Sequence, residues 1–335
     1  MERRRFIKIC GRRFLAIAAL VLLVSIGSRA QLVKGMMRDD EGYTINAHGA
    51  GILYYNSTYY LFGEIKGGKT WLVPHQQWED YRVPAGGVSC YSSTDLKHWK
   101  YEGVALAPVV GDTTKDLDTS RVIERPKVVY NAKTKEFVMW MHIDKKDYSY
   151  SRAGVAISDK PAGPYLYVGS VRPNGHMARD ITLFQDEDGK AYIIYASENN
   201  KTMHVCQLSK DYLSPTQKYS RVLVGRKREA PALFKKNGMY YLITSACTGW
   251  APNAAMYAVS ENIFGPYTEH GNPCQGSGAA TTFNAQSTFV FAIQDKPGNF
   301  IFMADRWNKR DLPKSDYLWL PLKAARGRVV IKGLD

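Results

Sequence analysis

Three acidic residues, Glu124, Asp180 and Glu229, lie at nearly the same position relative to three apolar segments, just before each segment begins. If these segments are strands that face a common centre, three carboxyl groups meet in one pocket. Repulsion and burial then raise the pKa of at least one of them. A carboxylic acid that keeps its proton near neutrality is a general acid, and a pair of such carboxyl groups is what cleavage of a glycosidic bond requires.

Two observations weigh against that interpretation. A single acid before a strand is more often a turn or edge residue, so the repetition of the pattern carries the argument. Arg125, Arg179 and Arg228 stand beside the three acids, and ion pairs with these arginines would lower the carboxyl pKa values instead of raising them.

The apolar segments belong to a repeat that predicts β-hairpins. An apolar segment, a short polar or glycine-containing turn and a second segment rich in aromatic residues recur five times, with about 50 to 75 residues between turns. The paired segments are 51–55 with 59–62, 126–130 with 137–141, 182–184 with 192–195, 232–234 with 240–243, and 288–291 with 300–303.

A second motif follows three of these hairpins: a serine, a polar turn and an aromatic residue, at 92–99, 158–165 and 260–267. It can supply the third and fourth strands of a four-stranded unit. We therefore predict an all-β protein, a five-bladed β-propeller with an axial active-site pocket, in which residues of equivalent phase converge on the axis. A β-sandwich or jelly roll is the alternative fold.

The first thirty residues have the order of a secretory signal: arginines and lysines, an apolar run over 14–26, and a small-residue site that ends at Ala30. We expect residues 1–30 to be a signal peptide and 31–335 to be the propeller domain, exported to the periplasm or outside the cell without a stable membrane span. Residues 1–30 hold seven basic residues and one acidic residue, so the net charge falls from +14 to +8 without them. This charge is dispersed, which argues against nucleic-acid binding.

Four cysteines remain after the predicted cleavage: Cys90, Cys206, Cys247 and Cys274. They have no CxxC or Cys/His spacing, so we expect no zinc site and no other metal or cofactor. Single cysteines at wide spacing are typical of buried small apolar residues, and we expect no disulfide framework.

The segments also resemble the family 43 glycoside hydrolases, and within them the exo-β-1,3-galactanase branch, over nearly the whole mature chain. The motifs that carry the resemblance are Glu124-Arg125-Pro126-Lys127, Arg179-Asp180-Ile181-Thr182, Arg228-Glu229-Ala230-Pro231, Thr248-Gly249-Trp250, Gln286-Ser287-Thr288 and Asp305-Arg306-Trp307-Asn308. The resemblance implies a five-bladed propeller in which Glu229 is the general acid and Asp180 tunes the pKa of that acid.

The resemblance leaves the catalytic base open. Most family members carry an Asp where this chain has Asn46-Ala47-His48-Gly49. In the galactanase-like branch a glutamine matching Gln286 is thought to take that role, as an imidic tautomer or by orienting water. The alternative role for Gln286 is to bind substrate hydroxyls only. Glu124 is a second carboxylate able to assist, and His48 is either a rival base or a structural hydrogen bonder.

The resemblance also implies a set of substrate-binding residues that combines planar hydrogen bonders with aromatic faces. These are Glu64, Glu124, Arg125, Tyr148, Asn199, Thr248, Trp250, Arg306 and Trp307. The aromatic members could equally be packing residues between blades.

The function implied is an exo-acting, inverting glycoside hydrolase that releases galactose from β-1,3-galactan or arabinogalactan. An α-L-arabinofuranosidase on the same fold and a non-catalytic carbohydrate-binding propeller are the alternatives. We expect a monomer whose partner is an oligosaccharide or polysaccharide.

Overall fold

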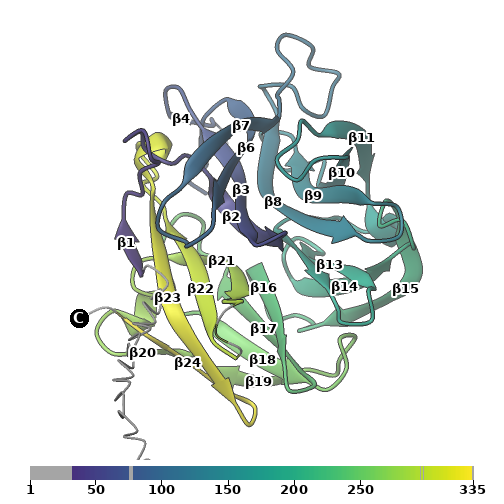
Figure 1. The fold of residues 1–335 in the computed structure, drawn as a ribbon, viewed down its shortest axis with the longest axis vertical. Coiled ribbons are helices and arrows are strands. Elements are labelled where there is room, and N and C mark those ends of the chain that lie inside the picture. Colours follow the sequence, from purple (N-terminus) through teal and green to yellow (C-terminus); the bar gives the residue numbers. More distant parts are fainter. Residues whose placement is uncertain (1–31, 75–77, 295, 297, 334–335) are drawn as a thin grey trace, which may run out of the picture.

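The structure is a computed structural model that describes residues 32–74, 78–294, 296 and 298–333. The predicted signal peptide and its boundary at residues 30 and 31 lie outside the described residues. In this part of the chain, five sheets stand around a common axis like the blades of a propeller (Figure 1); four are antiparallel, and the fifth includes one parallel strand pair. The predicted all-β, five-bladed architecture is confirmed, and the alternative of a sandwich or jelly roll is wrong.

Each of the first four blades is a sheet of four strands. The first strand of each blade contacts the first strands of the neighbouring blades, so these strands line the axis. The first blade consists of β2 (His48–Tyr55), β3 (Thr58–Lys66), β6 (Ala85–Ser93) and β7 (Lys100–Leu106), and the second of β8 (Val122–Asn131), β9 (Glu136–Asp144), β10 (Arg152–Ser158) and β11 (Leu166–Val171). The third consists of β12 (Ile181–Gln185), β13 (Ala191–Ser197), β14 (Thr202–Leu208) and β15 (Pro215–Val222). The fourth consists of β16 (Arg228–Lys236), β17 (Met239–Ala246), β18 (Met256–Ser260) and β19 (Thr268–Gly271).

The fifth blade joins the two ends of the described chain. Its strands are β21 (Gln286–Ala292), β22 (Phe300–Arg306), β23 (Asp316–Ala325), β24 (Arg328–Lys332) and the short β20 (Cys274–Gln275). Strand β1 (Val33–Gly35) pairs with the first half of β23, in the register Val33↔Trp319, and β24 pairs with the second half. The N-terminal strand therefore closes the ring of blades.

All five predicted hairpins are the first two strands of a blade, and the serine motif is the turn between the third and fourth strands. Each serine caps that turn; for example, Ser93 Oγ accepts a hydrogen bond of 2.8 Å from the Leu96 N–H. The aromatic residue after the turn is buried at Trp99 and Tyr165. The motif therefore both ends the third strand and anchors the fourth.

Three of the axial strands carry a β-bulge at the end nearest the site, where one residue adopts a left-handed conformation: Gly49 (φ 56°), Arg125 (φ 53°) and Ala230 (φ 53°). A bulge of this kind redirects the neighbouring side chains, and here those neighbours include Glu124 and Glu229. At Gly49 a Cβ would lie 2.9 Å from Glu64 Oε1 and 3.1 Å from the Arg125 N, so only glycine fits there.

Apolar side chains fill the space between blades, as where Trp99 of the first blade meets Trp319 of the fifth edge to face at 5.9 Å. The four described cysteines are unpaired, and all but Cys247 are buried. Within the described residues, helical structure is limited to three short 3-10 turns, η1 (Pro173–Gly175), η2 (Ala279–Thr281) and η3 (Leu312–Lys314). None of the helices in the described ranges has the length and hydropathy to cross a bilayer.

Candidate active site

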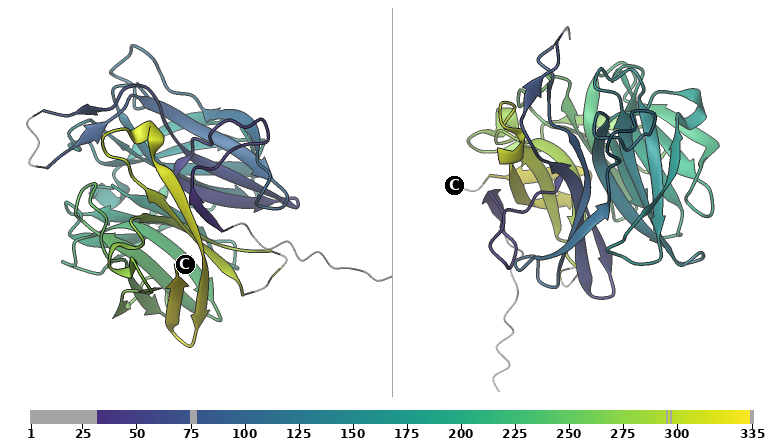
Figure 2. Two further views of the ribbon diagram at one scale, coloured as in Figure 1. Left: turned by 90° about the vertical axis from the view of Figure 1, so that its left-hand side faces the viewer. Right: turned by 90° about the horizontal axis from the view of Figure 1, so that it is seen from above.

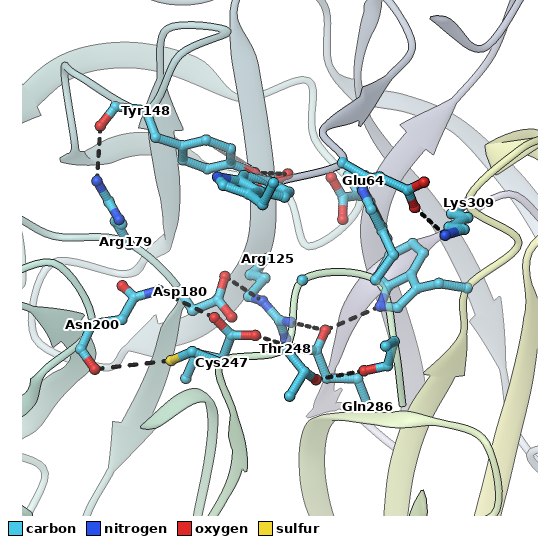
Figure 3. A pocket seen from close by; sticks show the side chains of 18 of the residues that line it. Glu64, Arg125, Tyr148, Arg179, Asp180, Asn200, Cys247, Thr248, Gln286 and Lys309 are labelled. Carbon is cyan, nitrogen blue, oxygen red and sulfur yellow. Dashed lines mark hydrogen bonds and ion pairs between the residues drawn. The ribbon is translucent and has the colours of Figure 1, made fainter. Parts of the chain in front are cut away.

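A cavity of about 680 Å³ opens at one end of the propeller axis, and all five blades contribute to its lining (Figure 3). Ten of the twelve predicted site residues line this cavity. They are Glu64, Glu124, Arg125, Tyr148, Asp180, Glu229, Thr248, Trp250, Gln286 and Trp307.

Glu229, on β16, has the properties expected of a general acid. Its Oε1 accepts a hydrogen bond from Gln286 Nε2 at 3.0 Å and its Oε2 accepts one from Asn200 Nδ2 at 3.1 Å. Removal from bulk water, reinforced by the negative charge of Asp180, raises the pKa of Glu229 to about 8 against the opposing effects of Arg125, Cys247 and Gln286. Glu229 therefore holds a proton at neutral pH.

The Asp180 side chain is held beside that acid by two contacts. Arg125 Nε lies 2.8 Å from Asp180 Oδ1, and the N–H of Ala230, the residue after Glu229, donates to Asp180 Oδ2 at 2.9 Å. Figure 3 shows Arg125 between Asp180 and Gln286. Both oxygens of Asp180 are thus engaged, and its charge is fixed close to Glu229.

The arginines beside the three acids do not pair with their sequence neighbours. Arg125 pairs with Asp180 of the next blade and not with Glu124. The Arg179 side chain donates to Ser151 Oγ and to the carbonyl oxygen of Tyr148. Arg228 donates to Thr244. Of these three acids, only Asp180 has an arginine within hydrogen-bond distance, so Glu229 lacks a direct ion pair that would lower its pKa.

Glu124 differs from Glu229 in that its pKa is lowered, so it is an ionised carboxylate at neutral pH. Its Oε2 lies 3.2 Å from His142 Nδ1, and Tyr148 donates its hydroxyl to Oε1 at 3.1 Å. Removal from water alone would raise the pKa of Glu124, but the His142 hydrogen bond and the charges of Lys66 and Arg82 outweigh it and hold the pKa well below its usual range.

His142, fully buried on β9, extends this network to a second carboxylate. Its Nε2 lies 2.9 Å from Asp144 Oδ2, while Asp144 Oδ1 accepts three backbone N–H groups, those of Lys145, Tyr150 and Ser151. Burial would lower the pKa of His142, yet the hydrogen bonds to Asp144 and Glu124 raise it to about 9. His142 is therefore an imidazolium between two carboxylates.

This charge state decides whether the same residues could hold a metal. One oxygen or nitrogen each from Glu124, His142 and Asp180 lie within 4.8 Å of one another, a spacing compatible with a cation. However, both His142 nitrogens carry protons directed at carboxylates, so the ring has no lone pair to offer. The Arg125 guanidinium already neutralises Asp180. The donor set does not fit a metal ion.

The His142→Gln substitution tests the imidazolium. We expect unfolding to become easier by about 3 kcal/mol near neutral pH, because Glu124 and Asp144 lose a buried cation. The His142 pKa is raised in the folded state, so its stabilisation is full below its ordinary value of 6.5 and disappears as the pH rises through about 9. Thermal unfolding at several pH values measures this, with the exposed His98→Gln as control. A deficit that persists unchanged at pH 10 would contradict the assignment.

Gln286, on β21, uses all four hydrogen-bonding positions of its amide. Oε1 accepts from Arg125 Nη2 at 2.8 Å and from Trp307 Nε1 at 3.0 Å, and Nε2 donates to Glu229 Oε1 and, at 3.1 Å, to Ser245 Oγ. Arg and Trp side chains can only donate, so the orientation of the amide is fixed. An imidic tautomer would place a hydroxyl at Oε1, where both neighbouring groups, Arg125 and Trp307, are donors and none could accept its proton. These hydrogen bonds therefore favour the ordinary amide form of Gln286.

His48, the rival base, does not line the cavity. It is buried, stacks on Tyr317 with ring centroids 5.0 Å apart, and its Nδ1 lies 3.5 Å from Asp305 Oδ1. These contacts assign His48 a structural role between the first and fifth blades.

The remaining lining residues supply hydrogen bonders and aromatic faces. Glu64 is buried and paired with Lys66 at 2.8 Å; burial raises the Glu64 pKa against the effect of Lys66. Trp250 and Trp307 pack edge to face, with ring centroids 5.3 Å apart. Thr248 donates its hydroxyl to the Ala251 carbonyl oxygen. The two indoles therefore form one wall of the cavity.

Two predicted residues lie outside the lining. Asn199 accepts from Arg179 Nη2 at 3.3 Å, and the next residue, Asn200, lines the cavity in its place. Arg306 pairs with Asp316. Both corrections follow from side-chain direction: Asn199 and Asn200 occupy a tight left-handed turn, and Arg306 ends β22 facing its partner strand, neither of which a sequence motif specifies.

Eight polar or aromatic lining residues were not predicted from the sequence: Lys66, Trp78, Glu79, Asp147, Arg179, Asn200, Cys247 and Lys309. Cys247 directly precedes the Thr248 motif, and Asn200 follows Asn199, so proximity to a motif was a usable signal for these two. Trp78 and Glu79 come from a segment between β3 and β6 that no repeat predicts.

The chain is similar to known proteins in sequence and in fold. Residues 47–302 match the family model described as glycosyl hydrolases family 43. A solved family 43 β-1,3-galactosidase in complex with galactodeoxynojirimycin is similar at 40% identity, with 91% of this chain and 99% of that chain covered and a TM-score of 0.82. An exo-β-1,3-galactanase from Phanerochaete chrysosporium, solved with β-1,3-galactotriose, is similar at 36% identity over 90% of this chain and 66% of that chain, with a TM-score of 0.80.

Similarity to curated proteins is weaker. The β-D-galactofuranosidase xynD of Aspergillus niger is 26% identical over 187 residues, which are 53% of this chain and 54% of that protein. The chain thus spans about half of this relative's length.

Proposed function

Because the chain belongs to glycosyl hydrolase family 43 and is a glycoside hydrolase, we propose that it acts on the ends of β-1,3-galactan chains, such as those of an arabinogalactan, and releases galactose with inversion. The observation that carries the proposal is the protonated Glu229 held beside the Asp180–Arg125 pair and Gln286 in one cavity.

In this proposal Glu229 protonates the oxygen that leaves the anomeric carbon. Asp180 keeps that proton on Glu229 by its negative charge, and Arg125 holds the Asp180 side chain in place. A general acid with a pKa near the working pH transfers its proton most effectively, and a pKa of about 8 meets that condition at neutral pH.

The contacts of the other carboxylates support inversion. A retaining mechanism needs a carboxylate free to attack the anomeric carbon. Both oxygens of Asp180 are held by Arg125 and the Ala230 N–H, and both oxygens of Glu124 are held by Tyr148 and His142. Water is therefore the nucleophile in the proposal, and the proton that it gives up passes to solvent in the open cavity. The amide of Gln286 is fully engaged by protein groups, and its role is to hold Glu229 and Arg125 in position.

Two polar atoms in the lining support a hydroxyl-rich ligand. Among the described residues, Asn200 Oδ1 and Trp250 Nε1 are buried and make no hydrogen bond. Buried polar atoms are normally paired, so an acceptor and a donor stand ready for sugar hydroxyls. Galactose as the sugar rests on the β-1,3-galactosidase and exo-β-1,3-galactanase to which the chain is similar.

The test is incubation of the purified protein with β-1,3-galactobiose, β-1,3-galactan and an arabinoside, with products identified by chromatography and their anomers followed by NMR. We expect galactose as the sole product from both galactosides, first as the α-anomer. Release of arabinose without galactose would replace this function by the arabinofuranosidase, and β-galactose as first product would contradict inversion.

The place of action is proposed from the sequence alone. The basic and apolar order of residues 1–30 supports export, which would bring the enzyme to a polysaccharide too large to enter a cell. Recovery of the mature protein beginning at Gln31 from a periplasmic or culture fraction tests this.

A further inference from the structure

The first blade carries a long insertion between β3 and β6 that reaches over the cavity. It contains a small hairpin, β4 (Trp71–Leu72) paired with β5 (Tyr81–Arg82), which projects beyond the blades (Figure 2). Trp78 and Glu79, just before β5, line the cavity together with Glu229.

Trp78 contacts two other blades. Its ring centroid lies 5.9 Å from that of Tyr148, which belongs to the second blade. A Cβ built on Gly249, in the fourth blade, would lie 3.5 Å from Trp78 Cε3. The first and fourth blades are not neighbours in the ring, since the first blade's axial strand packs against those of the second and fifth. The indole therefore spans the cavity between non-adjacent blades.

Charged contacts fix this position. The Arg82 guanidinium lies 4.4 Å from the Tyr148 ring centroid and 5.8 Å from that of Trp78, and Arg82 pairs with the fully buried Asp80 at 2.7 Å. Glu79 forms an ion pair with Lys309 of the fifth blade. Figure 3 shows Tyr148 and Lys309 far apart across the pocket, so the segment is held at both sides.

A polysaccharide that continues in both directions from the cleaved bond needs an open groove, whereas a bridge between opposite blades leaves room for a chain end. We propose that residues Trp78–Asp80 form a bridge that limits the enzyme to chain ends, with the Trp78 indole as the wall against which the terminal sugar packs. This inference rests on the proposed function and names the side chain responsible for its exo mode. Aromatic faces suit this role because sugar rings present apolar C–H surfaces.

The Trp78→Ala variant tests the bridge, with Trp71→Ala as matched control. Trp71 lies in the same hairpin with 39% of its surface exposed and does not line the cavity. With β-1,3-galactan labelled at its reducing end, we expect the wild type and Trp71→Ala to release galactose alone. Trp78→Ala should also release oligosaccharides of two or more units, and its KM for galactobiose should rise about fivefold to tenfold.

Two further variants keep the test decisive. Trp78→Phe retains an aromatic wall and should keep galactose as the main product. Glu79→Ala removes an exposed ion pair and is expected to fold. It should shift the products in the same direction as Trp78→Ala, but less. If Trp78→Ala folds and still yields galactose alone with KM within twofold of the wild type, the bridge does not set the exo mode. If the wild type itself releases no galactose, the proposed function fails instead.

Discussion

The Glu229→Gln variant is expected to lose about three orders of magnitude in kcat/KM on β-1,3-galactobiose at pH 7. Gln keeps the size of the side chain but has no acidic proton, and positioned general acids contribute about 10²- to 10⁴-fold. Steady-state assay of galactose release measures the loss. In the wild type the same proton should appear as a decline in kcat/KM above about pH 8, since Glu229 acts only when protonated and its pKa is about 8.

A substrate whose leaving group needs no proton separates catalysis from folding. On a dinitrophenyl galactoside, Glu229→Gln should lose far less activity than on galactobiose, because the dinitrophenolate leaves as a stable anion. An equal loss on both substrates would mean that Glu229 is needed for binding or structure and not as the acid. Retention of hydrolysis on galactobiose would remove Glu229 from the mechanism altogether.

The Asp180→Asn variant should lose about two orders of magnitude at pH 7 and shift the alkaline decline of kcat/KM to lower pH. Asp180 raises the pKa of Glu229 through its negative charge, and Arg125 lowers it. Without the carboxylate, the first effect vanishes and the guanidinium is left unpaired, so both changes lower the acid's pKa. At neutral pH a larger share of Glu229 is then ionised and inactive.

The pH profile of kcat/KM distinguishes this role from a structural one. Asp188→Asn is the matched control, since Asp188 is an exposed residue of the same blade, paired with Lys190. It should leave the profile unchanged. An Asp180→Asn enzyme with reduced kcat but an unmoved alkaline decline would show that Asp180 positions groups without tuning the acid.

The repeat of apolar segments was sufficient to predict the ring of blades, because short apolar segments and the Asn- and Gly-containing turns between them are local properties of the chain. The same reasoning placed Glu124, Asp180 and Glu229 in one cavity, since equivalent positions on axial strands must converge, whereas Gln286 was a candidate only through the family resemblance. These predictions needed only the phase of each strand.

What the sequence could not predict depends on contacts between blades. Arg125 forms its ion pair with Asp180 and not with its sequence neighbour Glu124, because the bulge at Arg125 changes the direction of the side chain. β-Bulges have no fixed sequence signature outside glycine. His142 looks like an ordinary buried position of β9, and its charge becomes apparent only once Glu124 and Asp144 are seen on its two nitrogens. The sequence likewise does not indicate that Asn200 rather than Asn199 faces the cavity, because the direction of each side chain is set by the left-handed turn that contains them.

The pairing of β1 with β23 bears on how the molecule is assembled. Val33 and Trp319 are partners although nearly the whole domain separates them along the chain, and contacts between such distant residues form slowly. The circle cannot be completed until the last blade has been synthesised. Because every blade supplies part of the cavity wall, catalytic competence arises only at that final joining, so a nascent or C-terminally truncated polypeptide would be inert toward polysaccharide.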